Sequence, residues 1–178
     1  MTKVVNLEAY RNKVDSEKGF GAWHRRFGET YSEKTRLADL SDKTLYSLAR
    51  PGEETAYAFY ELILGVLGLG EAPKFFYLSN KDQMLVMDIH LFLADQVRLE
   101  MMRRLGWLTG FVGEKYTLLE MVRKAEQVKA ECKGEPPRLS EARPDFEDYS
   151  RLTSGDKEMF LRRKLREALE AFHAGLAT

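Results

Sequence analysis

Hydrophobic and polar positions follow the period of α-helices through most of the chain. The longest uninterrupted stretch runs from Ser79 to Leu105 and contains neither proline nor glycine. Ser79 stands at an N-cap position with Asp82 three residues later, and Gly106 follows the final arginines as a helix stop. Residues 84–94 are apolar on nearly every side, which is typical of a helix that other helices enclose. We therefore expect a central helix over 79–105.

A second apolar helix is predicted over 53–67. The breaker Arg50-Pro51-Gly52 precedes it, and aromatic and branched residues fill its middle. Gly65 and Gly68 near its end do not form a dinucleotide-binding loop, because that loop needs a preceding strand and the order G-x-G-x-x-G. We interpret them as a close helix contact and a helix stop.

Shorter helices are predicted on both sides of this pair. Asn6 caps a first helix that ends at about Gly19, and leucines over 37–48 predict either one kinked helix or two short ones. Thr117 and Glu120 form a capping box for a helix that ends near Gly134.

These elements predict an all-α fold, a single-domain bundle of five to seven helices around the 53–67 and 79–105 helices. Residues 1–133 form the helical core, with a less regular part over 1–29. Residues 134–154 contain three prolines and are expected to be an extended arm. Residues 155–178 form an amphipathic helix that packs either on its own core or on a partner chain.

Composition narrows the classes of partner. The 178 residues carry 28 basic and 28 acidic side chains, so no overall field attracts nucleic acid or an anionic membrane. The first residues lack the apolar core of a signal peptide, and the central helix carries too many charges to span a bilayer alone. With Cys132 as the single cysteine, we expect a reducing, cytoplasmic location and no membrane partner.

The main candidate site lies on the central helix. Asp88, Asp95 and Arg98 are spaced by seven and three residues and share one face. Two carboxylates in an apolar setting suit proton transfer or a divalent metal. The interpretation that we favour is structural: Asp95 pairs with Arg98, and Asp88 pairs with a cation from another helix. If this face is a ligand site, the 53–67 helix is expected to add Tyr57, Tyr60 and Glu61.

A second candidate is the segment GFGAWHRRFG, which contains Trp23, Arg25 and Arg26. Arginines beside stacking aromatics suit a phosphate or a nucleic-acid strand. We favour an anchor instead, in which Trp23 and Phe27 pack on one face of a helix, because three cationic side chains make a small footprint for nucleic acid.

Motifs for other chemistry are absent from the sequence. No glutamate has histidine three residues later, as a di-metal bundle requires, and neither a zinc motif nor a phosphate-binding loop is present. We therefore expect no metal and no cofactor. Catalytic residues stay unassigned, and whether the protein is an enzyme is left open.

The sequence favours a non-enzymatic helical protein that acts by protein–protein association, as a homodimer or a subunit of a larger assembly. The first alternative is a small enzyme, or a regulator that binds a ligand or metal on the acidic face of the central helix. The second alternative is a weak nucleic-acid binder.

Overall fold

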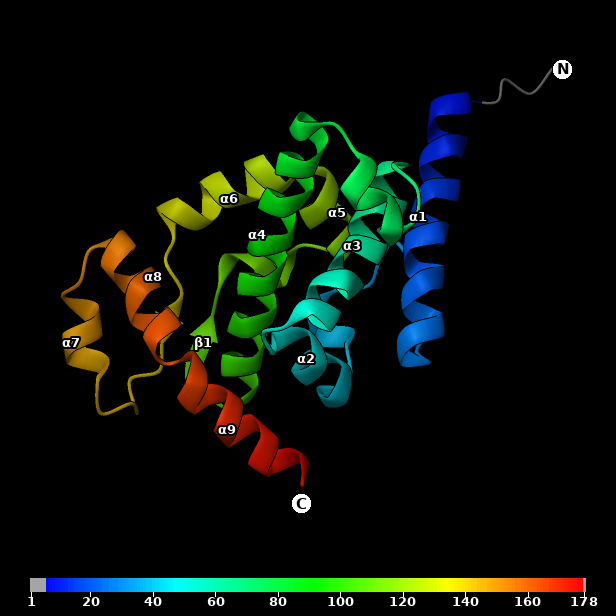
Figure 1. Ribbon diagram of the computed structural model, residues 1–178. Coiled ribbons are helices and arrows are strands. Elements are labelled where there is room, and N and C mark those ends of the chain that lie inside the picture. Colours follow the sequence, from blue (N-terminus) through cyan, green and yellow to red (C-terminus); the bar gives the residue numbers. More distant parts are fainter. Residues whose placement is uncertain (1–5, 178) are drawn as a thin grey trace, which may run out of the picture.

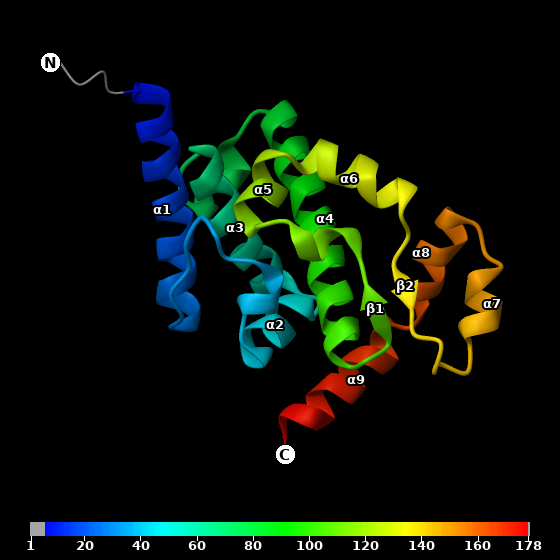
Figure 2. The same cartoon turned by 180° about the vertical axis from the view of Figure 1, so that it is seen from behind.

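The long helix α4 (Asn80–Arg104) runs through the middle of the fold, with the other elements on both sides of it (Figures 1 and 2). The computed structural model describes residues 6–177. Within this range the strands are β1 (Leu108–Gly110) and β2 (Arg138–Leu139), which pair antiparallel. The prediction of an all-α fold is confirmed.

The structure has more helices than the five to seven expected. The remaining α-helices are α1 (Leu7–Phe27), α2 (Asp42–Ala49), α3 (Glu53–Leu67), α5 (Leu118–Arg123), α6 (Ala125–Gly134), α7 (Phe146–Ser150), α8 (Ser154–Arg163) and α9 (Leu165–Leu176). Short 3-10 helices lie at η1 (Leu37–Asp39), η2 (Ala72–Tyr77) and η3 (Val112–Lys115). Two of the predicted helices are each divided at a lysine: Lys124 separates α5 from α6, and Lys164 separates α8 from α9.

The limits of α4 agree with the sequence. The Ser79 hydroxyl accepts a hydrogen bond from the Asp82 backbone N–H at 3.2 Å, which satisfies one of the free donors at the helix start. Arg103 and Arg104 lie in the last turn, at the negative end of the helix dipole. Gly106 follows with a φ of 79°, a left-handed conformation that suits glycine.

The prediction that α4 is enclosed on nearly every side is wrong for its first half. Met84, Met87 and Leu91 are 66%, 47% and 59% exposed; we call these three residues the α4 stripe. One side of the same turns is covered, because Val86 and Ile89 are buried in the core. A helical segment that is apolar on every side can therefore still expose one face to solvent, because its amino-acid composition does not show how many other elements pack on it.

The N-terminal part is more regular than expected, because α1 continues through Gly19 to Phe27. Gly19 is the point where α1 crosses α3. A Cβ atom on Gly65 would lie 2.6 Å from both the Cα and the backbone N of Gly19. The predicted close contact at Gly65 is confirmed, and Gly68 ends α3 with a φ of 70°. Residues 1–5 of the predicted N-terminal part lie outside the described residues.

The proline-containing segment is packed rather than extended. Its strand β2 pairs with β1, and its short helix α7 buries the ring of Tyr149. The Tyr149 hydroxyl donates a hydrogen bond to the Pro137 carbonyl at 2.5 Å, and the Arg143 guanidinium lies 4.2 Å from the centre of the Trp107 ring. Proline prevents regular helix here, but aromatic side chains still attach the segment to the body.

The C-terminal helix α9 packs on the chain's own core, against α2 and α4. Its Ala168 is fully buried and its Phe172 is 7% exposed. The bend at Lys164 makes this possible, because α9 turns away from α8 there and runs beneath α4 (Figure 1).

A buried ion network fastens the end of α4. The Glu100 side chain has no exposure to solvent, and its carboxylate accepts hydrogen bonds from Arg103 at 2.7 and 2.8 Å and from Arg104 at 3.1 Å. Arg104 also donates to the Leu37 carbonyl at 2.9 Å and to Asp42 at 2.8 Å. This network joins α4 to η1 and α2.

Candidate functional site

An open cavity of about 590 Å³ lies between α4, α6 and α8, which we call the α4–α8 cavity. Helices α6 and α8 lie on the same side of α4 in Figure 1. Apolar side chains form much of its wall, among them Leu91, Phe92, Leu99, Met102, Phe111, Val112, Leu161 and Leu165. Pro136 and Pro137 of the segment before β2 also line it.

The three candidate residues of the central helix all line this cavity. Asp95 lies 3.6 Å from Arg98, so the predicted ion pair is present, and Asp95 also accepts from Arg162 of α8 at 3.3 Å. Asp88 is exposed and forms no ion pair within residues 6–177, which differs from the expected pairing with another helix. The two carboxylates thus lie in different environments, one neutralised and one solvated.

The residues expected from the 53–67 helix face elsewhere. Glu61 accepts two hydrogen bonds from Arg26 of α1, at 2.7 and 2.9 Å, and the same guanidinium lies over the Tyr57 ring at 5.7 Å. Tyr60 stacks on Phe75 with ring centres 4.3 Å apart. Helix α3 directs these side chains toward α1 and η2, so the structure does not bring them to the cavity.

The tryptophan of the GFGAWHRRFG segment is an anchor. Trp23 is fully buried, its indole N–H donates to the Ala58 carbonyl at 2.8 Å, and its ring meets Phe27 edge-on at 5.6 Å. Arg26 is neutralised by Glu61, whereas Arg25 is exposed. A buried ring cannot stack on a base, so Trp23 gives no aromatic platform for a nucleic-acid strand, and contact of Arg25 and Arg26 with an anion stays a prediction.

Sequence reasoning missed the most unusual polar group of the cavity wall, Gln96. The residue is 4% exposed, and its amide oxygen is buried without a hydrogen-bond partner within the part of the chain that the structure describes. The amide oxygen packs against Gly113, where any Cβ atom would collide with it. A buried polar group without a partner costs free energy, and such groups are rare in native proteins. The signal in the sequence was an amide that follows Asp95 in the otherwise apolar stretch 92–97.

Cys132 also lines the cavity, half-buried at the end of α6. Burial raises the pKa of its thiol to about 11, and the negative charges of Glu131 and Glu158 act in the same direction. The thiolate is the nucleophilic form, so a thiol with this pKa is a poor nucleophile at neutral pH.

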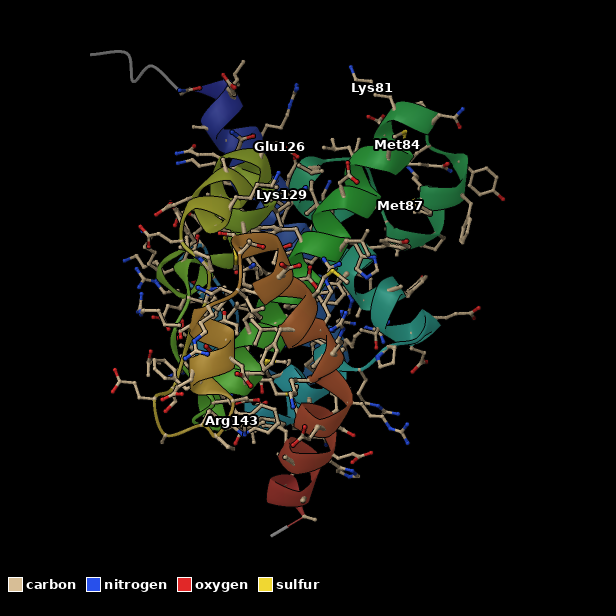
Figure 3. All side chains as sticks on the ribbon, turned by 90° about the vertical axis from the view of Figure 1, so that its left-hand side faces the viewer. Lys81, Met84, Met87, Glu126, Lys129 and Arg143 are labelled. Carbon is tan, nitrogen blue, oxygen red and sulfur yellow. The ribbon has the colours of Figure 1, made fainter. Side chains whose placement is uncertain are left out.

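Charges of both signs surround the apolar wall in equal number. The acidic side chains are Asp88, Asp95, Glu135 and Glu158, and the basic ones are Arg98, Lys129, Lys133 and Arg162. Lys129 and Glu126 lie beside each other on α6 in Figure 3, with their charged groups 3.2 Å apart. The charges of the lining residues therefore sum to zero.

The described residues give no support for a metal site or for a membrane-spanning helix. Residues 6–177 contain no cluster of three or more His, Cys, Asp and Glu side chains placed to hold a metal ion. Among the described helices, none combines the length and the apolar character that crossing a bilayer requires. Comparison with protein-family models, with curated proteins and with solved structures finds no match to this chain.

Proposed function

We propose that the protein binds a small, largely apolar and uncharged molecule in the α4–α8 cavity. The observation that carries this proposal is the amide oxygen of Gln96, a residue of the cavity lining, which is buried without a hydrogen-bond partner among the described residues. A ligand that hydrogen-bonds to this amide recovers the free energy that its burial costs.

The size and lining of the cavity support a small molecule. Binding sites for such ligands are typically about 300–1,000 Å³, mostly apolar, with a few polar groups that orient the ligand. The α4–α8 cavity has a volume of about 590 Å³, and Phe92, Leu99 and Met102 line it together with Gln96. We therefore expect an apolar body that carries a hydrogen-bond donor for the Gln96 amide oxygen, such as the N–H of a carboxamide.

The charges around the cavity favour an uncharged ligand. Four acidic and four basic side chains line it, and Asp95 is already paired with both Arg98 and Arg162. A strongly charged ligand gains little from a lining whose charges cancel, and it loses hydration on entry.

Binding is favoured over catalysis by the state of the reactive groups. Cys132 has a raised pKa of about 11, and Asp95 is neutralised by two arginines. A general base or a nucleophile needs its reactive form at working pH. The Cys132 thiol does not offer that form at neutral pH, and the Asp95 carboxylate is engaged in ion pairs with Arg98 and Arg162.

Benzamide is a suitable first probe, with toluene as its apolar counterpart. We expect benzamide to shift the NMR signals of the Gln96 side-chain amide and the Met102 methyl group, and to slow alkylation of Cys132. Gln96→Met keeps the length of the side chain and removes the amide. It should weaken benzamide binding about tenfold, the effect of losing about 1.4 kcal/mol, and leave toluene binding unchanged.

The matched control is Gln127→Met, the same replacement at an exposed position of α6 outside the cavity. It should change neither affinity. Equal benzamide affinity in Gln96→Met and the native protein would contradict the role of the amide, and benzamide shifts confined to residues outside the cavity would contradict the site itself.

A second function, association with another protein chain, is supported by a separate observation. The α4 stripe exposes three large apolar side chains on one face of a helix, and such faces mark interaction surfaces more often than isolated apolar residues do. The proline-containing segment gives no support, because it and α9 pack on the chain's own core. Light scattering over a range of concentrations tests association: the mean mass should rise above that of one chain.

A further inference from the structure

The α4 stripe has the spacing of a helix-pairing seam. Met84, Met87 and Leu91 are separated by three and then four residues, the repeat that keeps apolar side chains on the contact line between two helices. All three are about half exposed or more, although Val86 and Ile89 on the other side of the same turns are buried. One face of α4 thus belongs to the core, and the stripe on the other face stays largely exposed.

Two opposite charges lie beside this stripe. Lys81 and Asp88 are seven residues apart, so they occupy equivalent positions along the same edge of the seam. Both side chains are exposed, and neither forms an ion pair within the range that the structure describes. In Figure 3, Lys81, Met84 and Met87 follow one another along the upper turns of α4.

We propose that a second copy of this chain covers the α4 stripe, with the two α4 helices antiparallel about a two-fold axis. This inference rests on the second proposed function, association, and names its partner. In a two-fold contact, residue i of one copy meets residue j of the other and the reverse also holds. Met84 then packs on the second copy's Met87, and Lys81 faces the second copy's Asp88.

The charge pattern selects both the partner and the orientation. When a second copy of the helix runs in the opposite direction, the positive charge on one edge faces the negative charge of the second copy. The negative charge then faces the positive one. A parallel pair would place Asp88 beside the second copy's Gln83 and would leave Lys81 without an opposite charge from Asp88, so the Lys81–Asp88 contact would not form. Antiparallel pairing forms the Lys81–Asp88 contact twice.

We expect the pairing of the two α4 helices to be weak. We also expect its contact surface to border the α4–α8 cavity. Three apolar side chains from each copy make an interface at the small end of the range for specific complexes, so we expect a dissociation constant of roughly 10 µM to 1 mM. Leu91 and Asp88 belong both to this surface and to the lining of the α4–α8 cavity. The second copy would therefore add to the wall at that edge of the cavity.

Sedimentation equilibrium of the full chain, from about 10 µM to about 1 mM, tests the pairing. The native protein should shift from monomer to dimer. Lys81→Glu and Asp88→Lys should each raise the dissociation constant about fivefold or more, because each places like charges in contact twice. The double variant restores opposite charges and should return the constant to within about twofold of the native value.

Met87→Glu should abolish the dimer, because two glutamates would lie beside the axis in an apolar seam. The matched control is Met159→Glu, at a half-exposed position of α8 outside the stripe, which should change nothing. A dimer that withstands Met87→Glu, or single variants that the double variant does not rescue, would overturn the α4 pairing and leave association standing. A native protein that stays monomeric at about 1 mM would overturn self-association altogether.

Discussion

Glu100 shows at the scale of one residue how this fold accommodates a buried charge. Its carboxylate has no contact with solvent, yet two arginines one turn further along α4 donate three hydrogen bonds to it. Desolvation of a carboxylate is costly, and only close partners of opposite charge offset that cost. The hydrogen-bond network extends beyond Glu100, because Arg104 also donates hydrogen bonds to the Leu37 carbonyl and to Asp42.

We predict that Glu100→Gln lowers the free energy of unfolding by about 2 kcal/mol. The replacement keeps the shape but removes the charge that neutralises Arg103 and Arg104. The loss should stay below the largest values known for broken buried pairs, because the arginine side chains are 34% and 15% exposed and retain some hydration. Urea denaturation measures the change.

The control for this prediction is Glu126→Gln, the same replacement in the exposed pair with Lys129. An exposed pair contributes little, so the change in stability should be within about 0.5 kcal/mol. If the two variants were equally stable, the buried network would not fasten α4 as described.

At the scale of elements, the crossing of α1 and α3 depends on two glycines rather than on interlocking side chains. Gly19 and Gly65 bring the two backbones so close that neither position has room for a methyl group. A Cβ atom on Gly19 would lie 2.8 Å from the Leu62 carbonyl oxygen. Phe20 and Trp23 then enter the core beside this contact.

Gly65→Ala should therefore lower the free energy of unfolding by about 2 kcal/mol. Overpacking a close contact costs about 1–3 kcal/mol, and the better helix propensity of alanine returns at most about 1 kcal/mol of it. Thermal denaturation followed by circular dichroism measures the loss.

Gly134→Ala provides the comparison, because Gly134 is also helical but has open space around it. Alanine there should leave stability unchanged or raise it by about 0.4–1 kcal/mol. Equal losses at both positions would mean that helix propensity, and not the contact between α1 and α3, determines the effect.

At the scale of the whole molecule, the C-terminal helix belongs to the same core as the N-terminal one. One cluster of buried hydrophobic side chains extends from Phe20 of α1 to Phe172 of α9. The ring of Phe172 also stacks with Tyr46 of α2, with ring centres 6.4 Å apart. We expect the core and the C-terminal helices to unfold together.

Phe172→Ala should lower stability by about 3 kcal/mol, the usual cost of removing a buried aromatic ring. The unfolding transition should remain single, with the same midpoint by near-UV and far-UV circular dichroism. Leu176→Ala, four residues on and 37% exposed, should change stability by much less. Two separate transitions in the native protein would contradict a single folding unit.

The helices with local signals follow from the sequence alone. The Ser79 cap, the Gly106 stop and the absence of proline and glycine between them define α4, and the breaker before Glu53 and the stop at Gly68 define α3. Caps and stops act through hydrogen bonds and backbone angles within a few residues, so the sequence contains them. The Asp95–Arg98 pair was predictable for the same reason, because it spans one helical turn.

Which faces of those helices are covered depends on tertiary packing. Residues 84–94 have the composition of an enclosed helix, but the three side chains of the α4 stripe stay about half exposed or more. The cavity beside Gln96, the turn of Glu61 toward Arg26 and the return of α9 onto α2 all join residues distant in sequence. Such contacts depend on how whole helices pack, and packing follows from the sum of many weak interactions that no local pattern records.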